Sequence, residues 1–235
     1  MMGECQSSPL PLPPDFILPE GKRPNLSEVS RLASIPIIDL THELSKLTQE
    51  ISRACEDYGF FQVINHGVPS ELCGKMMNSI SSFFETFPEE KAKFYAANND
   101  DDSNTRQVKL QNFHLKVNAD GCSGGEGGEM EIRMWSETFS YPCHSLHEII
   151  HLLPDNPPHY REVFAAYAEE VGGLTTRLLS LISQGLGLQK DCLQKRLGNK
   201  PRQRAYANYY PPCPSPELTL GLAVHTDPHA LTLLR

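Results

Sequence analysis

Apolar residues recur every three to four positions in three parts of the chain, the spacing that places them on one face of a helix. The pattern predicts helices over about 41–58, after Pro69, and over 160–184. In the last of these the apolar positions are Tyr160, Val163, Phe164, Tyr167, Val171, Leu174, Leu178 and Leu181. Gly59 and Gly185 follow the first and third patterns, and we expect them to end those helices, because glycine readily adopts the left-handed conformation of a helix C-terminus.

Short runs of β-branched and aromatic residues predict strands. One begins at Pro36 and extends to about residue 40, and residues 60–65 predict a second, buried strand. Residues 98–130 lack a regular pattern and are expected to form a loop around one strand near 108–117. Further strands are predicted towards the C-terminal end, at 204–210, 218–226 and 230–234.

The order of these elements, with helices first and strands last, predicts an α+β fold. Residues 1–34 are rich in proline, which favours extended structure. This lead is therefore expected to pack, if at all, along the outside of the protein.

Composition and charge narrow the class of protein. The chain has 235 residues, with 21 Lys and Arg against 29 Asp and Glu, so its formal net charge is −8. These values are typical of one globular domain, or of a domain with an appendage, and exclude collagen-like, coiled-coil and fully disordered chains. No stretch approaches the roughly 18 apolar residues of a membrane helix, and the acidic balance argues against nucleic-acid and anionic-membrane partners.

Seven cysteines occur, and none forms a C-x-x-C pair, so neither a disulfide framework nor a zinc ribbon is predicted. The thiols are expected to be buried or inert in a reducing compartment. The first residues lack the basic and apolar regions of a secretory signal. A cytoplasmic location is therefore expected.

His225 and Asp227 give the strongest chemical signal. Apolar residues alternate just before them, which predicts that both lie on a strand. On an extended chain, residues two positions apart point to the same face, so the imidazole and the carboxylate would project together. Such a pair supplies two ligands of the 2-His-1-carboxylate triad of non-haem Fe(II) oxygenases. The alternative is a simple bend that begins at Asp227-Pro228.

Several motifs around this pair resemble those of the plant Fe(II)/2-oxoglutarate-dependent dioxygenases. NYYPPCP at 208–214 and GLAVHTDPHALTLL at 221–234 carry the resemblance at the C-terminal end. The resemblance covers about 35–235 and is greatest to the hyoscyamine-hydroxylase-like and downy-mildew-resistance-like branches. The other matching motifs are IPIIDL, ACEDYGFFQVINHGVP, WSETFSYPCHSL and NPPHYREVFAAYAEEVGGL.

The resemblance implies a helical N-terminal region over 35–200 and the start of an incomplete double-stranded β-helix, or jelly-roll, core over 201–235. It implies that His225 and Asp227 bind Fe(II), and that Asn208 and Tyr210 contact the co-substrate 2-oxoglutarate, with no separate catalytic side chain. Such enzymes convert 2-oxoglutarate and O₂ to succinate and CO₂ while they hydroxylate or desaturate a small organic metabolite of plant specialised metabolism, at times with ascorbate. We expect a monomer with no nucleic-acid or membrane partner.

The sequence departs from the family pattern in two ways. The family's second histidine ligand and its R-x-S motif, whose arginine holds 2-oxoglutarate, are not found after Asp227, and His229 lies too close to replace a ligand from an opposite strand. The chain is therefore expected to be a truncated product, a splice form or a fragment, with impaired activity. Ser136 stands where similar sequences often carry a basic residue.

Two other functions remain open from the sequence. Residues 147–151 match the H-E-x-x-H pattern of zinc peptidases, in which two histidines share one helix face beside a general base. Pro142 and Pro154 leave little room for that helix, and the other interpretation is a short surface helix with Ile149, Ile150 and Leu153 directed inward. A non-catalytic, regulatory protein that docks on an intact relative is the third class.

Overall fold

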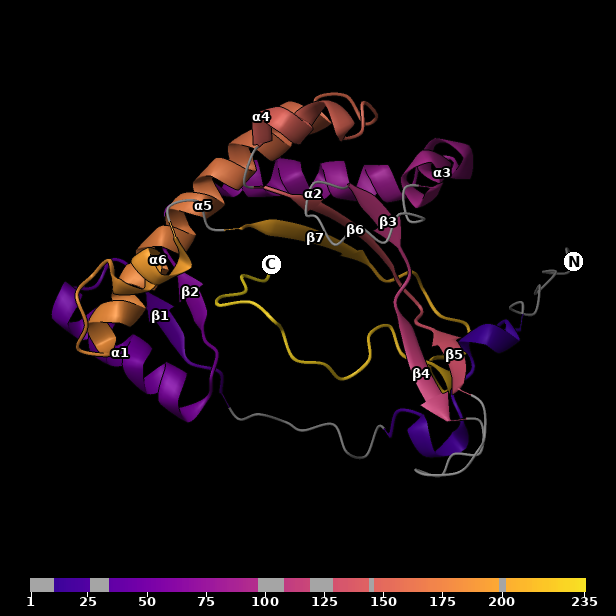
Figure 1. Cartoon of the computed structure of the whole chain (residues 1–235), viewed down its shortest axis with the longest axis horizontal. Helices are drawn as coiled ribbons and strands as arrows, with labels where there is room; N and C mark the ends of the chain where they lie inside the picture. The colour runs from indigo at the N-terminus through magenta and orange to yellow at the C-terminus, as the bar shows by residue number, and fades with distance from the viewer. Residues whose placement is uncertain (1–10, 26–33, 97–107, 119–128, 144–145, 199–201) are drawn as a thin grey trace, which may run out of the picture. The chain divides into compact units, whose positions relative to one another are not determined.

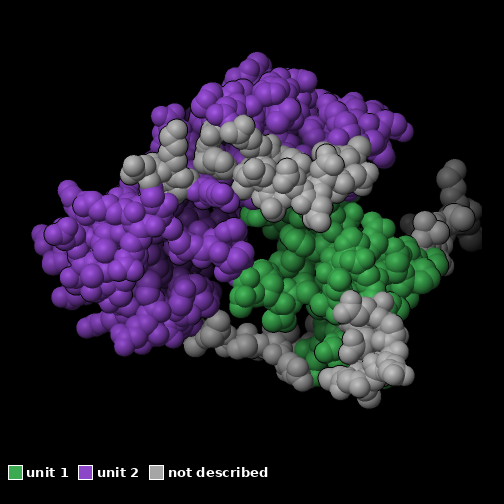
Figure 2. All heavy atoms as spheres, viewed as in Figure 1, with its two compact units in different colours: residues 1–30, 109–140, 206–226 green, residues 31–108, 141–205, 227–235 purple. Residues whose placement is uncertain are grey.

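The computed structural model describes residues 11–25, 34–96, 108–118, 129–143, 146–198 and 202–235 (Figure 1). The chain divides into two compact units, drawn in green and purple in Figure 2. Unit 1 consists of Met1–Ser30, Lys109–Ser140 and Tyr206–Thr226. Unit 2 consists of Arg31–Val108, Tyr141–Ala205 and Asp227–Arg235. Each unit therefore joins segments that are far apart in the sequence.

Unit 2 is built around three long helices, and all three were predicted. They are α1 (Leu44–Asp57), α2 (Ser70–Phe84) and α5 (Tyr160–Gly185), with α1 and α2 both in contact with α5 (Figure 1). Gly59, at φ 75°, follows α1 in the left-handed conformation expected at a helix end. Shorter helices complete the unit: α3 (Pro88–Ala96), α4 (Leu146–Ile149) and α6 (Cys192–Leu197).

The core of unit 2 lies where α1, α5 and a small parallel sheet meet. Strand β1 (Ile37–Asp39) pairs with β2 (Gln62–Ile64) in parallel register, which confirms both predicted strands. The expectation that the second is buried was wrong, because Gln62 and Ile64 are exposed, and Phe61 and Val63, which pack on the core, are only partly buried. The buried members of this core are Ile38, Leu40, Leu47, Ile51, Ala54, Val68, Cys73, Leu174, Leu178 and Leu181.

A cluster of aromatic rings holds the other end of α5. The Tyr141 and Phe164 rings meet edge to face at 4.5 Å, and the Tyr160 hydroxyl donates a hydrogen bond of 3.3 Å to the Tyr141 hydroxyl. Burial raises the pKa of both phenols well above the ordinary range, so both stay protonated. The hydrogen bond between the two hydroxyls therefore gives each of them a partner inside an apolar cluster.

The structure bears out only part of what was predicted for the cysteines, since Cys73 is buried but Cys55 is exposed. The five that the structure describes, Cys55, Cys73, Cys143, Cys192 and Cys213, are all free thiols. Burial raises the pKa of the Cys143 thiol to about 12, so this thiol is protonated and unreactive at neutral pH.

Unit 1 contains a hairpin and most of a three-stranded sheet. Strands β4 (His114–Asn118) and β5 (Glu129–Arg133) pair in antiparallel register. The other sheet has the order β3–β6–β7, with β3 antiparallel to β6. Its strands are β3 (Lys109–Gln111), β6 (Glu137–Pro142) and β7 (Arg204–Tyr209), of which β6 and β7 each contribute residues to both units. Two strands thus occupy the region where one was predicted.

The proline-rich lead does not lie only along the outside of the protein. It forms two short 3₁₀ helices, η1 (Pro14–Phe16) and η2 (Glu20–Lys22), and between them Leu18 is completely buried. Leu18 packs with Ile132 and Met134 in the core of unit 1, and its amide donates a 2.9 Å hydrogen bond to the Leu218 carbonyl. The expectation failed because the partners of Leu18 come from distant parts of the chain.

The predicted strands at 218–226 and 230–234 are absent. The chain forms the short 3₁₀ helix η6 (Pro216–Leu218) and then runs without regular structure to Arg235. A strand needs a neighbour to satisfy its backbone, and within the described part of the chain no strand pairs with this segment. Leu231 and Leu233 still pack on the core of unit 2.

The predictions for residues 1–10 and for most of the loop over 98–130 concern residues outside those that the structure describes. Among the helices that are described, none is both long enough and apolar enough to cross a membrane.

Replacing a core residue of α1 tests the assignment of its buried face. Ile51 has no exposed surface, whereas Leu44 on the same helix is 54% exposed. Ile51→Ala is expected to lower the free energy of unfolding by about 2–5 kcal/mol, because it leaves a cavity. Leu44→Ala, the matched control, should change it by about 0.5 kcal/mol or less. Urea unfolding followed by circular dichroism measures both, and equal losses would contradict the assignment.

Thr219 provides a test in unit 1. Its side chain is buried, and its hydroxyl has no hydrogen-bond partner among the described residues. A buried hydroxyl without a partner carries a desolvation cost of about 1–3 kcal/mol. Thr219→Val keeps the shape and removes the hydroxyl, so it should raise the free energy of unfolding by about 1 kcal/mol. Thermal unfolding measures the change, and a loss of stability would show that the hydroxyl has a partner in solution.

Candidate metal centre

His225 and Asp227 lie in the irregular segment that follows η6, and both are exposed. His225 is close to the end of unit 1, and Asp227 begins the last segment of unit 2. The strand on which the common-face argument rested has not formed, so that argument does not apply to this structure. Their pairing stays a prediction.

The position of the His225 ring bears directly on metal binding. Its Nδ1 lies 2.9 Å from the Ala223 carbonyl oxygen. A carbonyl only accepts hydrogen bonds, so Nδ1 carries the hydrogen in this contact. In the neutral ring the lone pair is then on Nε2, and a backbone carbonyl on the opposite nitrogen is a common way to orient a metal-binding histidine. Nε2 of His225 is therefore the atom suited to bind a metal.

The donor types fit Fe(II), but their number falls short of a complete site. Imidazole nitrogen and carboxylate oxygen are the donors of the non-haem iron triad. Among the residues that the structure describes, no group of three His, Cys, Asp or Glu side chains is placed to hold a metal ion. His225 and Asp227 thus offer two donors.

Asn208 and Tyr210, the predicted co-substrate residues, lie at the end of β7. Asn208 is in the strand and Tyr210 is the next residue after it. The Asn208 Oδ1 accepts a 2.8 Å hydrogen bond from the Thr138 hydroxyl, which lies on β6. Tyr210 is half exposed. Both side chains belong to unit 1.

Nothing in the sequence pointed to Trp135 as a residue of the site, and Ser136 stood out only as a departure from the family. Both lie just before β6 and hydrogen-bond to the segment that follows Tyr210. Ser136 is 4% exposed, so it belongs to the interior of unit 1. The local sequence could not predict these contacts, because they join positions some 75 to 85 residues apart.

The geometry of a zinc peptidase is absent from residues 147–151. The helix α4 ends at Ile149, and Ile150–Leu152 forms a 3₁₀ turn, so His147 and His151 do not share one α-helical face. The side chain of His147 is largely exposed. Of the three residues that the surface-helix interpretation directs inward, Ile149 and Leu153 are buried and Ile150 is partly buried.

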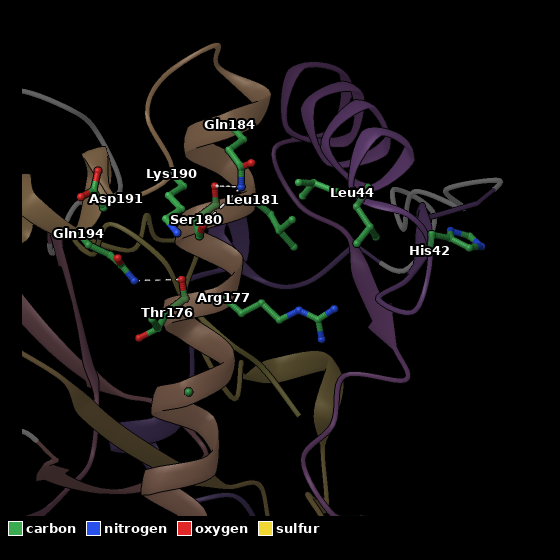
Figure 3. Close-up of a pocket in the computed structure, with 12 residues that line it drawn as sticks. His42, Leu44, Thr176, Arg177, Ser180, Leu181, Gln184, Lys190, Asp191 and Gln194 are labelled. Atoms are coloured by element: carbon green, nitrogen blue, oxygen red, sulfur yellow. Dashed lines mark hydrogen bonds between the residues drawn. The ribbon is translucent and has the colours of Figure 1, made fainter.

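A separate cavity of about 530 Å³ lies in unit 2 beside α5 (Figure 3). Its walls come from α1, α5 and α6 and from the turn after β1, and none of the predicted site residues lines it. Gln194 Nε2 donates to the Thr176 carbonyl across it at 3.1 Å, and Arg177 donates to the Leu40 carbonyl. These contacts join α5 to α6 and to the turn after β1, and the described residues that line the cavity include no group of three possible metal ligands.

Sequence profiles of two families match the chain. The family described as "non-haem dioxygenase in morphine synthesis N-terminal" matches residues 35–166. The "2OG-Fe(II) oxygenase superfamily" matches residues 201–235, which contain His225 and Asp227. Together the two profiles cover most of the chain.

Individual relatives agree with the profiles. The protein DOWNY MILDEW RESISTANCE 6 of Arabidopsis thaliana is 40% identical over 95% of this chain and 61% of its own length. Hyoscyamine 6-dioxygenase of Hyoscyamus niger is 37% identical over 94% of this chain and 61% of its own length. Flavanone 3-dioxygenase 2 of Oryza sativa subsp. japonica is 35% identical over 95% of this chain and 60% of its own length. The chain therefore spans about three fifths of the length of these relatives.

A solved structure shows the same fold. The crystal structure of JOX2 in complex with 2OG, Fe and JA superposes with a TM-score of 0.71 and 30% sequence identity. The match covers 96% of this chain and 60% of that one. The helices and antiparallel sheets described above thus correspond to part of a jelly-roll oxygenase fold, as the sequence predicted.

Proposed function

Because the chain belongs to the plant Fe(II)/2-oxoglutarate-dependent dioxygenases, we propose that it binds Fe(II) and 2-oxoglutarate and takes part in the oxidation of a small organic metabolite by O₂. The observation that carries the proposal is the match of both family profiles, of which the second includes His225 and Asp227. The orientation of the His225 ring supports it, since the contact with Ala223 leaves Nε2 to bind a metal.

Each predicted residue has a distinct task in this proposal. Nε2 of His225 and the carboxylate of Asp227 hold the metal, as two of the protein donors that the family's triad requires. Asn208 and Tyr210 orient 2-oxoglutarate by hydrogen bonds from their amide and phenol groups. When bound, the iron supplies the oxidative decarboxylation of 2-oxoglutarate to succinate and CO₂ that drives hydroxylation or desaturation.

The substrate class follows from the relatives. They include a hyoscyamine dioxygenase and a flavanone dioxygenase, whose names refer to small organic molecules. We infer a substrate of that size and kind. The net charge of −8 supports a function without nucleic acid or an anionic membrane as partner, because either would repel the protein.

Metal binding tests the assignment of His225 and Asp227. Co(II) serves as a spectroscopic probe for Fe(II), and its affinity for the purified chain is measured by absorption and calorimetry. Disturbing a group that only supports a ligand costs about 10–100-fold in affinity. Losing a ligand itself should cost more, so His225→Ala and Asp227→Ala are each expected to weaken Co(II) binding by at least about tenfold.

Two histidine variants serve as controls for this titration. His229→Ala removes an exposed imidazole two residues beyond Asp227, and His147→Ala removes the exposed imidazole of the H-E-x-x-H sequence. Both should bind Co(II) like the unmodified chain. If His147→Ala abolished binding while His225→Ala did not, a zinc site at 147–151 would replace the proposed one.

The reaction itself is followed as succinate formed from 2-oxoglutarate in the presence of Fe(II) and ascorbate. Turnover that His225→Ala abolishes and His229→Ala preserves is the result expected of a dioxygenase. Metal binding at His225 without any turnover would instead assign the chain a non-catalytic role, and co-purification with an intact dioxygenase would then identify that role as regulatory.

A further inference from the structure

The segment between β7 and His225 is fixed in place with little regular structure of its own. Apart from η6, residues 210–224 form neither helix nor strand. Hydrogen bonds within unit 1 take the place of the backbone bonds that a strand would make with a neighbouring strand. Three of them are donated by Trp135 and Ser136. These two residues lie between β5 and β6, so the link between two strands of unit 1 holds the segment that leads to the predicted metal ligands.

Trp135 bonds to the segment at two separate points. Its backbone amide donates to the Leu220 carbonyl at 2.8 Å, and its indole Nε1 donates to the Pro211 carbonyl at 3.0 Å. Its ring packs edge to face on Phe16 at 5.0 Å. Because the backbone of Trp135 bonds to Leu220 and its indole bonds to Pro211, this one residue links two points of the segment.

Ser136 makes the third bond from a buried position. Its hydroxyl donates to the Gly221 carbonyl at 2.6 Å. Its own carbonyl accepts a 2.8 Å hydrogen bond from the Asn112 side chain, whose Oδ1 accepts from Arg133 at 3.3 Å. A large basic residue would not fit this 4% exposed position without displacing Gly221. The departure from the family pattern at Ser136 is thus matched to its surroundings.

Gly221 in turn supports the ring of Tyr210. A Cβ atom at position 221 would lie 2.7 Å from Cδ1 and 3.0 Å from Cε1 of Tyr210, closer than such atoms approach in proteins. The Tyr210 ring therefore rests directly on the Gly221 backbone. Its position depends on where Ser136 and Trp135 hold residues 220 and 221.

We infer that Trp135 and Ser136 are positioning residues for the co-substrate, which hold Gly221 as a platform for the Tyr210 ring. The inference rests on the proposed function, in which Tyr210 contacts 2-oxoglutarate. The two residues touch neither metal nor co-substrate in this scheme and act only through the Pro211, Leu220 and Gly221 carbonyls.

The test compares two buried serines in the full chain. Ser136→Ala removes the bond to Gly221, and Ser183→Ala, the matched control, removes an equally buried hydroxyl that donates to the Leu179 carbonyl within α5 at 2.8 Å. Tyrosine rings are labelled with ¹³C, and the Tyr210 signal is identified by its absence in Tyr210→Phe. The affinity for 2-oxoglutarate is measured by calorimetry with Co(II) present.

Ser136→Ala should shift the Tyr210 ring signal in the ligand-free chain and weaken 2-oxoglutarate binding by about three- to tenfold, the range expected for one neutral hydrogen bond. Gly221→Ala should also shift the signal, because its methyl group displaces the ring. Ser183→Ala should lower stability without either effect. Trp135 is the one tryptophan of the chain, so its fluorescence reports the loosened contact in Ser136→Ala directly.

The outcomes separate this inference from the proposed function. If Ser136→Ala and Ser183→Ala lose similar stability and neither moves the Tyr210 signal nor the affinity, the inference is overturned. If the unmodified chain does not bind 2-oxoglutarate but Ser136→Ala still shifts the signal, the proposed function fails and the co-substrate role of Ser136 fails with it. The contact with Tyr210 would then be purely structural.

Discussion

Unit 2 depends on the burial of one apolar stripe of α5. Leu174, Leu178 and Leu181 on this helix are almost fully buried against α1 and the β1–β2 sheet. Burying a leucine side chain contributes about 1.5–3 kcal/mol, which outweighs the roughly 1 kcal/mol that each of the two glycines in the middle of the helix costs. The aromatic cluster around Tyr160 then fixes the other end of the same helix.

Unit 1 is organised differently. One of its apolar clusters is formed by Leu18, Ile132 and Met134, and Leu110 and Phe139 on its three-stranded sheet are also fully buried. Polar contacts also join its segments: Arg133 pairs with Asp15 at 3.2 Å while its guanidinium lies 4.7 Å from the Phe16 ring centre. The pair is partly exposed, so the ion pair itself contributes little, and the specificity of these contacts matters more than their energy.

The sequence predicted what depends on local pattern and missed what depends on distant partners. The helices α1, α2 and α5 follow from the spacing of apolar residues, and the strand starting near Pro36 follows from local composition. The burial of Leu18 and the bonds of Trp135 come from contacts across much of the chain and leave no local signal. For the site, the two-residue spacing of His225 and Asp227 predicted a ligand pair, and the resemblance to the family strengthened that prediction. The strand argument for them failed, and the tautomer of His225 became visible only through Ala223.

The contact of Tyr210 with Gly221 has a consequence for how this segment can vary. A Cβ atom at 221 crowds the aromatic ring at 210, so substitutions at the two positions are coupled and their effects on stability do not add. A smaller residue at 210 would relieve the crowding that alanine at 221 causes. The two positions are therefore expected to change together in evolution, although ten residues lie between them in the chain.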